Sequence, residues 1–213
     1  MPLDPSRLAL FLAATLALTL TPGPAVLFLV TRTVSQGRRA GLLSLLGIGL
    51  GNCVHAGATA LGLAALLASV PVAFTAVKLL GAGVLVWMGV RRLLDRSAPG
   101  LVAQPAQRGP AAGTLRQAFA VAALNPKTAL FFLAFLPQFA SPALGHLPFQ
   151  LLLLGAIFVA TAMLTDGGYV LLADGLGRFL RRHPGFARAE RWVSAAVYAG
   201  LGLLAALAQR PGT

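Results

Sequence analysis

Residues 8–31 read LALFLAATLALTLTPGPAVLFLVT, and this run decides the fold class because it contains no charged side chain. A helix that spans a bilayer needs about 20 predominantly apolar residues. Arg7 before the run imitates a secretory signal peptide, but such a peptide has an apolar core of only about 7–15 residues and a small-residue cleavage site. The run is longer and has no clear site of that kind. It therefore predicts a retained first transmembrane helix.

The composition extends this prediction to the whole chain. Charged residues make up 10% of the sequence and hydrophobic residues 57%, with a mean hydropathy of +0.81. A soluble domain carries about 25% charged residues, so this chain has too little polar surface for a water-soluble globule. We predict an all-α polytopic membrane protein of about six transmembrane helices forming a single transmembrane domain. The predicted segments are residues 8–31, 41–67, 72–90, 117–139, 149–173 and 192–208.

The net charge of +12 is placed in the connections between the segments. Arginines cluster after the first, third and fifth segments, and no basic stripe with aromatic residues predicts a nucleic-acid partner. Cytoplasmic loops are enriched in Lys and Arg, so these connections are expected in the cytoplasm and both termini on the opposite, outer side if all six segments span. The clustered residues are Arg32, Arg38, Arg39, Arg91, Arg92, Arg96, Arg108, Arg116, Arg178, Arg181, Arg182, Arg188 and Arg191.

The longest connection, residues 95–115, is rich in Pro, Ala, Gln and Arg and is predicted to be a cytoplasmic linker. It divides the chain into halves at about 1–94 and 116–210, each with three predicted helices. Because an odd number of helices precedes the linker, the halves enter the membrane from opposite faces. This topology is typical of transporters built from inverted repeats.

Two helix breakers interrupt the first and fourth segments. Thr21-Pro22-Gly23-Pro24 has two prolines, and Asn125-Pro126-Lys127 joins a proline to a cation. Proline removes a backbone donor and disfavours helix in the residue before it. A simple packing kink is one interpretation; the other is a pair of interrupted helices at a transporter's central site. On the second interpretation, we predict that all seven residues bind the substrate.

Three charged residues lie inside apolar segments, where charge is rare and usually functional. Lys127 either faces a cavity, where it would attract a carboxylate, or extends its ammonium to the interface. Lys78 lies nearer a segment end, so interfacial placement is easier. Asp166 could carry the proton of an antiport cycle or be a fixed partner of Lys127 or Lys78. Asp166 and Lys78 are therefore the predicted proton-coupling residues.

The second segment carries two polar side chains, Asn52 and His55, that can share a face with Gly51. Asn52 is predicted to bind substrate, whereas a lone buried histidine is more often a packing residue. Gly47 and Gly51 form a small-xxx-small pair that permits a close helix approach.

Other classes of chemistry lack their motifs. The single Cys53 supports neither a disulfide nor a cysteine metal site within one chain, and the sequence contains no GxSxG, P-loop, HExxH or Rossmann pattern. We expect no cofactor, no metal and no enzymatic activity. Two alternatives stay open: an intramembrane lipid-modifying enzyme using Asp166 and His55, and an efflux carrier for another small solute or cation.

The chain resembles the LysE/RhtB family of amino acid exporters along nearly its whole length. The resemblance is carried by LTPGP at 20–24, Gly37, Gly41, Gly47, Gly51, KLLG at 78–81, Gly89, and above all LNPKTALFFLAFLPQF at 124–139. It implies a small, often dimeric carrier that uses the proton gradient to expel amino acids or derivatives such as homoserine, threonine, leucine or lysine. Val84 and Ala196 depart from the Tyr and Gly frequent in the family.

Overall fold

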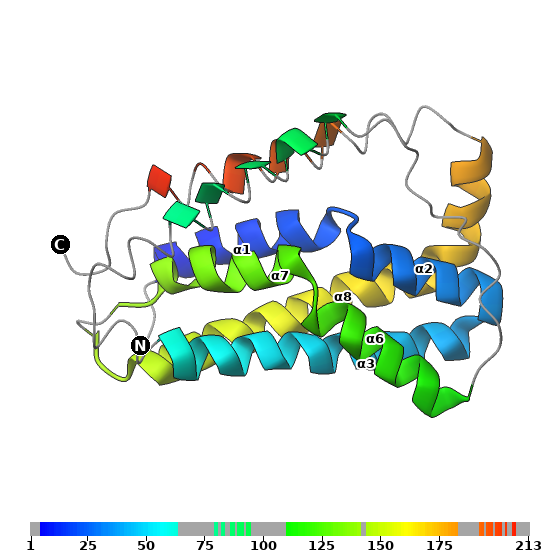
Figure 1. The fold of residues 1–213 in the computed structure, drawn as a ribbon, viewed down its shortest axis with the longest axis horizontal. Helices are drawn as coiled ribbons and strands as arrows, with labels where there is room; N and C mark the ends of the chain where they lie inside the picture. The colour runs from blue at the N-terminus through cyan, green and yellow to red at the C-terminus, as the bar shows by residue number, and fades with distance from the viewer. Residues whose placement is uncertain are drawn as a thin grey trace.

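The computed structural model describes residues 5–63, 110–141 and 144–182, with side chains only to 173 in the last stretch, and single residues within 79–94 and 192–207. All regular elements described are helices (Figure 1). They are α1 (Pro5–Leu20), α2 (Pro24–Gln36), α3 (Arg38–Ala58), the π-helix η1 (Thr59–Leu63), α6 (Ala111–Ala123), α7 (Pro126–Leu130), the π-helix η2 (Phe131–Phe135), the 3-10 helix η3 (Leu136–Phe139) and α8 (Leu147–Arg182).

The proline motifs break the first and fourth predicted segments. Ser6–Leu20 and Pro24–Gln36 are bent by 50°, and Ala111–Ala123 and Pro126–Phe139 by 43°. Arg38–Gly62 and Leu147–Ala173 are each long and apolar enough to cross a membrane, so the described residues hold two spans, or up to four if each bent pair is one span. The prediction of a helical polytopic membrane protein with these two interruptions is confirmed. The third and sixth predicted segments lie largely outside the described residues.

The two bent pairs run antiparallel to each other, and so do the two long helices (Figure 1). The α1–α2 pair runs opposite to α6–α7, and α3 runs opposite to α8. The α2–α3 turn, the start of α6 and the end of α8 consequently lie at the same end of the bundle, and the predicted basic connections begin or end there. We call this the basic end. The start of α1 and the turn before α8 lie at the opposite end.

Helix α3 has one lipid-like face and one packed face. Leu42, Leu46, Leu50 and Val54 recur every four residues and are exposed, which suits a surface solvated by lipid. The other face packs on α6: a Cβ added to Gly47 would lie 2.5 Å from the Leu115 carbonyl oxygen, and one on Gly51 would lie 2.6 Å from the Ala122 Cβ. The predicted close approach at the glycine pair is therefore confirmed.

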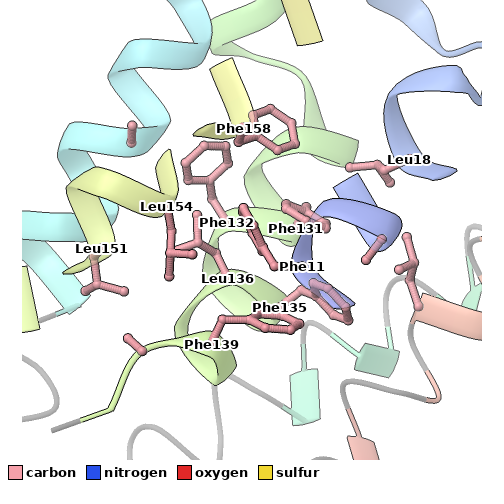
Figure 2. Packing of buried hydrophobic residues seen from close by; sticks show 14 of the residues in the cluster. Phe11, Leu18, Phe131, Phe132, Phe135, Leu136, Phe139, Leu151, Leu154 and Phe158 are labelled. Atoms are coloured by element: carbon pink, nitrogen blue, oxygen red, sulfur yellow. The ribbon is translucent and has the colours of Figure 1, made fainter. Parts of the chain in front are cut away.

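A cluster of phenylalanine rings joins α1, the segment from η2 to η3, and α8 (Figure 2). Its ring centroids lie 4.9–6.4 Å apart in tilted and edge-on pairs, the arrangements that aromatic quadrupoles favour. The cluster sits toward the end opposite the basic end. We call it the aromatic cluster, and its members are Phe11, Phe131, Phe132, Phe135, Phe139 and Phe158.

Two element boundaries differ from the sequence-based ones. Helix α6 begins at Ala111, inside the predicted 95–115 linker, because Pro110 precedes an alanine pair that favours helix. Helix α8 continues to Arg182, well past the predicted end at 173. Leucine and arginine are good helix formers, so a change from apolar to basic composition marks where a helix leaves the bilayer and not where it stops.

Candidate functional site

The two helix breaks meet at the centre of the bundle. The Lys127 ammonium donates a hydrogen bond of 2.5 Å to the Thr21 carbonyl oxygen. The Tyr169 hydroxyl on α8 donates one of 2.8 Å to the Leu20 carbonyl oxygen. In a continuous helix Leu20 would accept from residue 24, but that residue is proline and has no N–H. Side chains from the second half of the chain thus satisfy backbone groups released by the break in the first half.

The second break has its own local cause. Asn125 is extended, with φ −74° and ψ 109°, as expected for a residue that precedes proline. Its side-chain oxygen accepts the Lys127 backbone N–H at 3.1 Å, which caps the new helix. Lys127 therefore stands in the first turn of α7, beside the first break.

A cavity of about 40 Å³ lies at this junction. Room of that size accommodates only a few water molecules. Its polar side chains are Thr19, Asn52, Asn125, Lys127, Thr128 and Asp166. The remaining lining residues are Leu18, Gly23, Ala25, Val26, Ile48, Phe158 and Ala162. Four spans contribute to the wall, so the site exists only in the assembled bundle.

Five predicted site residues line the cavity together: Gly23, Asn52, Asn125, Lys127 and Asp166. Thr21 contributes its carbonyl oxygen to Lys127. The three prolines are not among the lining residues: Pro22 is half-buried, while Pro24 and Pro126 are exposed and stand at helix starts, so their predicted contact with substrate stays a prediction. Lys78 lies outside the described residues, so its predicted coupling role stays a prediction.

Lys127 and Asp166 give the cavity two opposite charges. Their exposed fractions are 6% and 5%, and they are close enough for their charges to interact. Burial is costly for each charge alone, because water no longer solvates it. Attraction between the two is stronger than in water, because less solvent lies between them. The cavity therefore brings one buried positive and one buried negative group together.

Several lining residues had not been predicted. Ile48 and Ala162 lie one helical turn before Asn52 and Asp166, and Thr128 directly follows Lys127. Residues four apart share a helix face, so helical periodicity around Asn52 and Asp166 could have found Ile48 and Ala162. Tyr169, three residues after Asp166, could have been found in the same way.

His55 is not among the cavity residues. Its Nε2 lies 3.1 Å from the Ala122 carbonyl oxygen, and its ring stacks on Phe132 at a centroid distance of 5.9 Å. These contacts suit the packing role considered for it. Among the residues that the structure describes, no group of three or more His, Cys, Asp and Glu side chains could hold a metal ion.

Residues 16–207 match the family model of the LysE type translocators. The chain belongs to this family. The translocator is thus a membrane transporter, and the alternative of a lipid-modifying enzyme is wrong.

Relatives agree with this membership. An uncharacterized membrane protein of Vibrio cholerae is 32% identical over 93% of this chain and 96% of its own length. A homoserine/homoserine lactone efflux protein of Salmonella typhi is 29% identical over 80% of this chain and 82% of its own. A leucine efflux protein of Klebsiella pneumoniae is 30% identical over 61% of each. No solved structure matches the translocator.

Proposed function

We propose that this translocator exports amino acids or amino acid derivatives across the bacterial inner membrane, by alternating access coupled to proton antiport. The observation that carries the proposal is the pairing of buried Lys127 and Asp166 in one cavity where both helix breaks meet. Relatives named for the efflux of homoserine, homoserine lactone and leucine support the substrate class.

The carboxylate of the substrate would bind at the Lys127 side of the cavity. The N-terminus of α2 supports this assignment, because the first N–H groups of a helix have no partner within it and carry partial positive charge. Gly23 at this N-cap has no side chain to satisfy them, and Ala25 and Val26 in the first turn line the cavity. An ammonium and a helix N-terminus together favour an anionic group.

The Asp166 carboxylate is suited to bind the ammonium group of an amino acid. It can bind either the substrate's ammonium group or a proton, and the two compete for the same oxygens. Competition of this kind couples substrate release to proton uptake, which is the requirement for antiport. Asn52 and Asn125 add amide groups that donate and accept hydrogen bonds beside the two charges.

The small size of the cavity supports the alternating-access part of the proposal. A volume of about 40 Å³ admits a few waters but no amino acid, so substrate must enter by moving the broken helices apart. Entry would take place from the basic end, which the positive-inside rule assigns to the cytoplasm, with the termini in the periplasm. Exit requires the aromatic cluster at the other end to open.

The carboxylate of an entering substrate would also replace the Thr21 oxygen as a partner of Lys127. The bond between Lys127 and the first helix break is then exchanged for a bond to the substrate. This exchange gives the substrate a differential affinity for two states, without which a ligand cannot shift a conformational equilibrium.

Reconstitution in proteoliposomes loaded with a panel of labelled amino acids and derivatives tests the proposal. With an imposed pH gradient, the wild-type protein should transport at least one panel member faster than empty liposomes. Asp166→Asn should abolish the dependence on the gradient, whereas Asp174→Asn, the same substitution eight residues further along α8, should retain it. Absence of transport across the whole panel would contradict the function, and unchanged coupling in Asp166→Asn would contradict the proton step.

A carrier for metal cations is the alternative that the same panel addresses. The buried Lys127 ammonium argues against it, because it would repel a cation in a cavity whose one carboxylate it already attracts. Transport of a divalent cation, with no response to amino acids, would favour this alternative.

A further inference from the structure

Thr15 on α1 is fully buried, and its hydroxyl has no hydrogen-bond partner among the described residues. Several other hydroxyls in the described chain behave differently, since they donate to the carbonyl oxygen four residues earlier. Examples are Thr21, Thr33, Ser35, Ser44 and Thr161. A buried polar group without a partner is unfavourable and uncommon, and it indicates an interaction made in another state or with another molecule.

The position of Thr15 suggests what that molecule is. Residues four apart lie on one helix face, which places Thr15 between Thr19, in the cavity wall, and Phe11, in the aromatic cluster. On the facing helices the rings of Phe158 and Phe131 are 5.2 Å apart, and those of Phe131 and Phe11 are 6.1 Å apart. Phe158 lines the cavity, so this chain of rings leads outward along the same route (Figure 2).

We propose that the Thr15 hydroxyl is a second polar contact for the substrate, on the outward route between the cavity and the aromatic cluster. When the rings separate, the hydroxyl would hydrogen-bond the carboxylate or ammonium group of the amino acid as it leaves. In the arrangement seen here Thr15 is fully buried, and its hydroxyl has no partner among the described residues. The inference rests on the proposed function, and it assigns a substrate contact outside the central cavity.

Thr15→Val tests this directly, because it keeps the shape of the side chain and removes only the hydroxyl. Removing an unpaired buried hydroxyl should raise the melting temperature by about 2–4 °C. Loss of a substrate hydrogen bond should lower the efflux rate roughly tenfold. Thr15→Ser retains the hydroxyl and should keep most of the rate.

Thr33→Val is the matched control, because Thr33 is equally buried but its hydroxyl donates to the Leu29 carbonyl oxygen at 2.7 Å. It should lower the melting temperature and leave efflux unchanged. If Thr15→Val transports like the wild type, or melts at a lower temperature, the inference is overturned. If the wild-type protein transports no panel member, the proposed function fails instead.

A labelling experiment tests the same position without measuring transport. The chain has one cysteine, so Thr15→Cys in a Cys53→Ser background carries a single thiol. A small membrane-impermeant thiol reagent on the side opposite the basic end should label it faster when leucine or homoserine and a pH gradient are present. Leu16→Cys, on the exposed face of α1, should show no such change. A labelling rate for Thr15→Cys that is independent of substrate would overturn the inference.

Discussion

Removing the Lys127 ammonium gives a direct test of the site, because this group interacts both with the first helix break and with Asp166. Lys127→Met keeps a stem of similar length and removes the charge. It leaves the Thr21 carbonyl oxygen without this donor and Asp166 without the nearby positive charge. Breaking a buried charge pair costs about 3–5 kcal/mol, and a buried carbonyl that loses its partner adds about 1–3 kcal/mol. A loss of about 4–8 kcal/mol in the free energy of unfolding is therefore expected if the two costs add.

A double-mutant cycle separates the charge interaction from general damage. Asp166→Asn removes the opposite charge, so Lys127→Met in that background should be less destabilising than in the wild type, by about 1–3 kcal/mol. Equilibrium unfolding in mixed detergent micelles measures all four proteins, with exposed Arg39→Met as a control expected to change stability by less than about 0.5 kcal/mol. Additive effects within about 0.5 kcal/mol would refute the coupling of the two charges in one site.

Three further substitutions test the packing around the site. Arg32 on α2 hydrogen-bonds Gln117 on α6 near the basic end, so Gln117→Leu should cost about 1.5–3 kcal/mol of unfolding free energy in micelles. Gly51→Ala should cost about 1–3 kcal/mol, because its Cβ would lie 2.6 Å from a side-chain atom of α6, whereas Gly57→Ala meets open space and should be neutral or stabilising in the same assay. Fully buried Gln150 makes three hydrogen bonds to the turn before α8, so Gln150→Leu should lower the melting temperature by several degrees; an unchanged value would contradict that role.

The helix breaks could be predicted from the sequence because their cause is local. Proline lacks an N–H wherever it stands, and the residue before it avoids helical angles. The same holds for the glycine pair of α3, whose missing side chains permit close approach to any neighbour. The fold class and the two helix interruptions could be predicted because they follow from such local properties and from the composition.

The contacts within the site could not be predicted in the same way. The Lys127 bond to Thr21 joins residues 106 positions apart, and the Tyr169 bond to Leu20 joins residues 149 apart. Both depend on where the assembled helices place the two breaks. The sequence alone therefore left two possible positions for Lys127, a cavity or the interface, and only the spacing from Asp166 pointed to Tyr169.

These two long-range bonds also suggest why a transporter would keep prolines in its first span. A continuous helix satisfies its own carbonyl groups, so no other element could hold or release it. Here the carbonyl oxygens of Leu20 and Thr21, released by the helix break, are satisfied by side chains of α8 and α7, which belong to the other half of the chain. In the proposed mechanism, a substrate carboxylate that binds the Lys127 ammonium would weaken the attachment between the halves at the point where they must separate. The break would then make the position of the first span depend on the occupancy of the site, which is the coupling that alternating access requires.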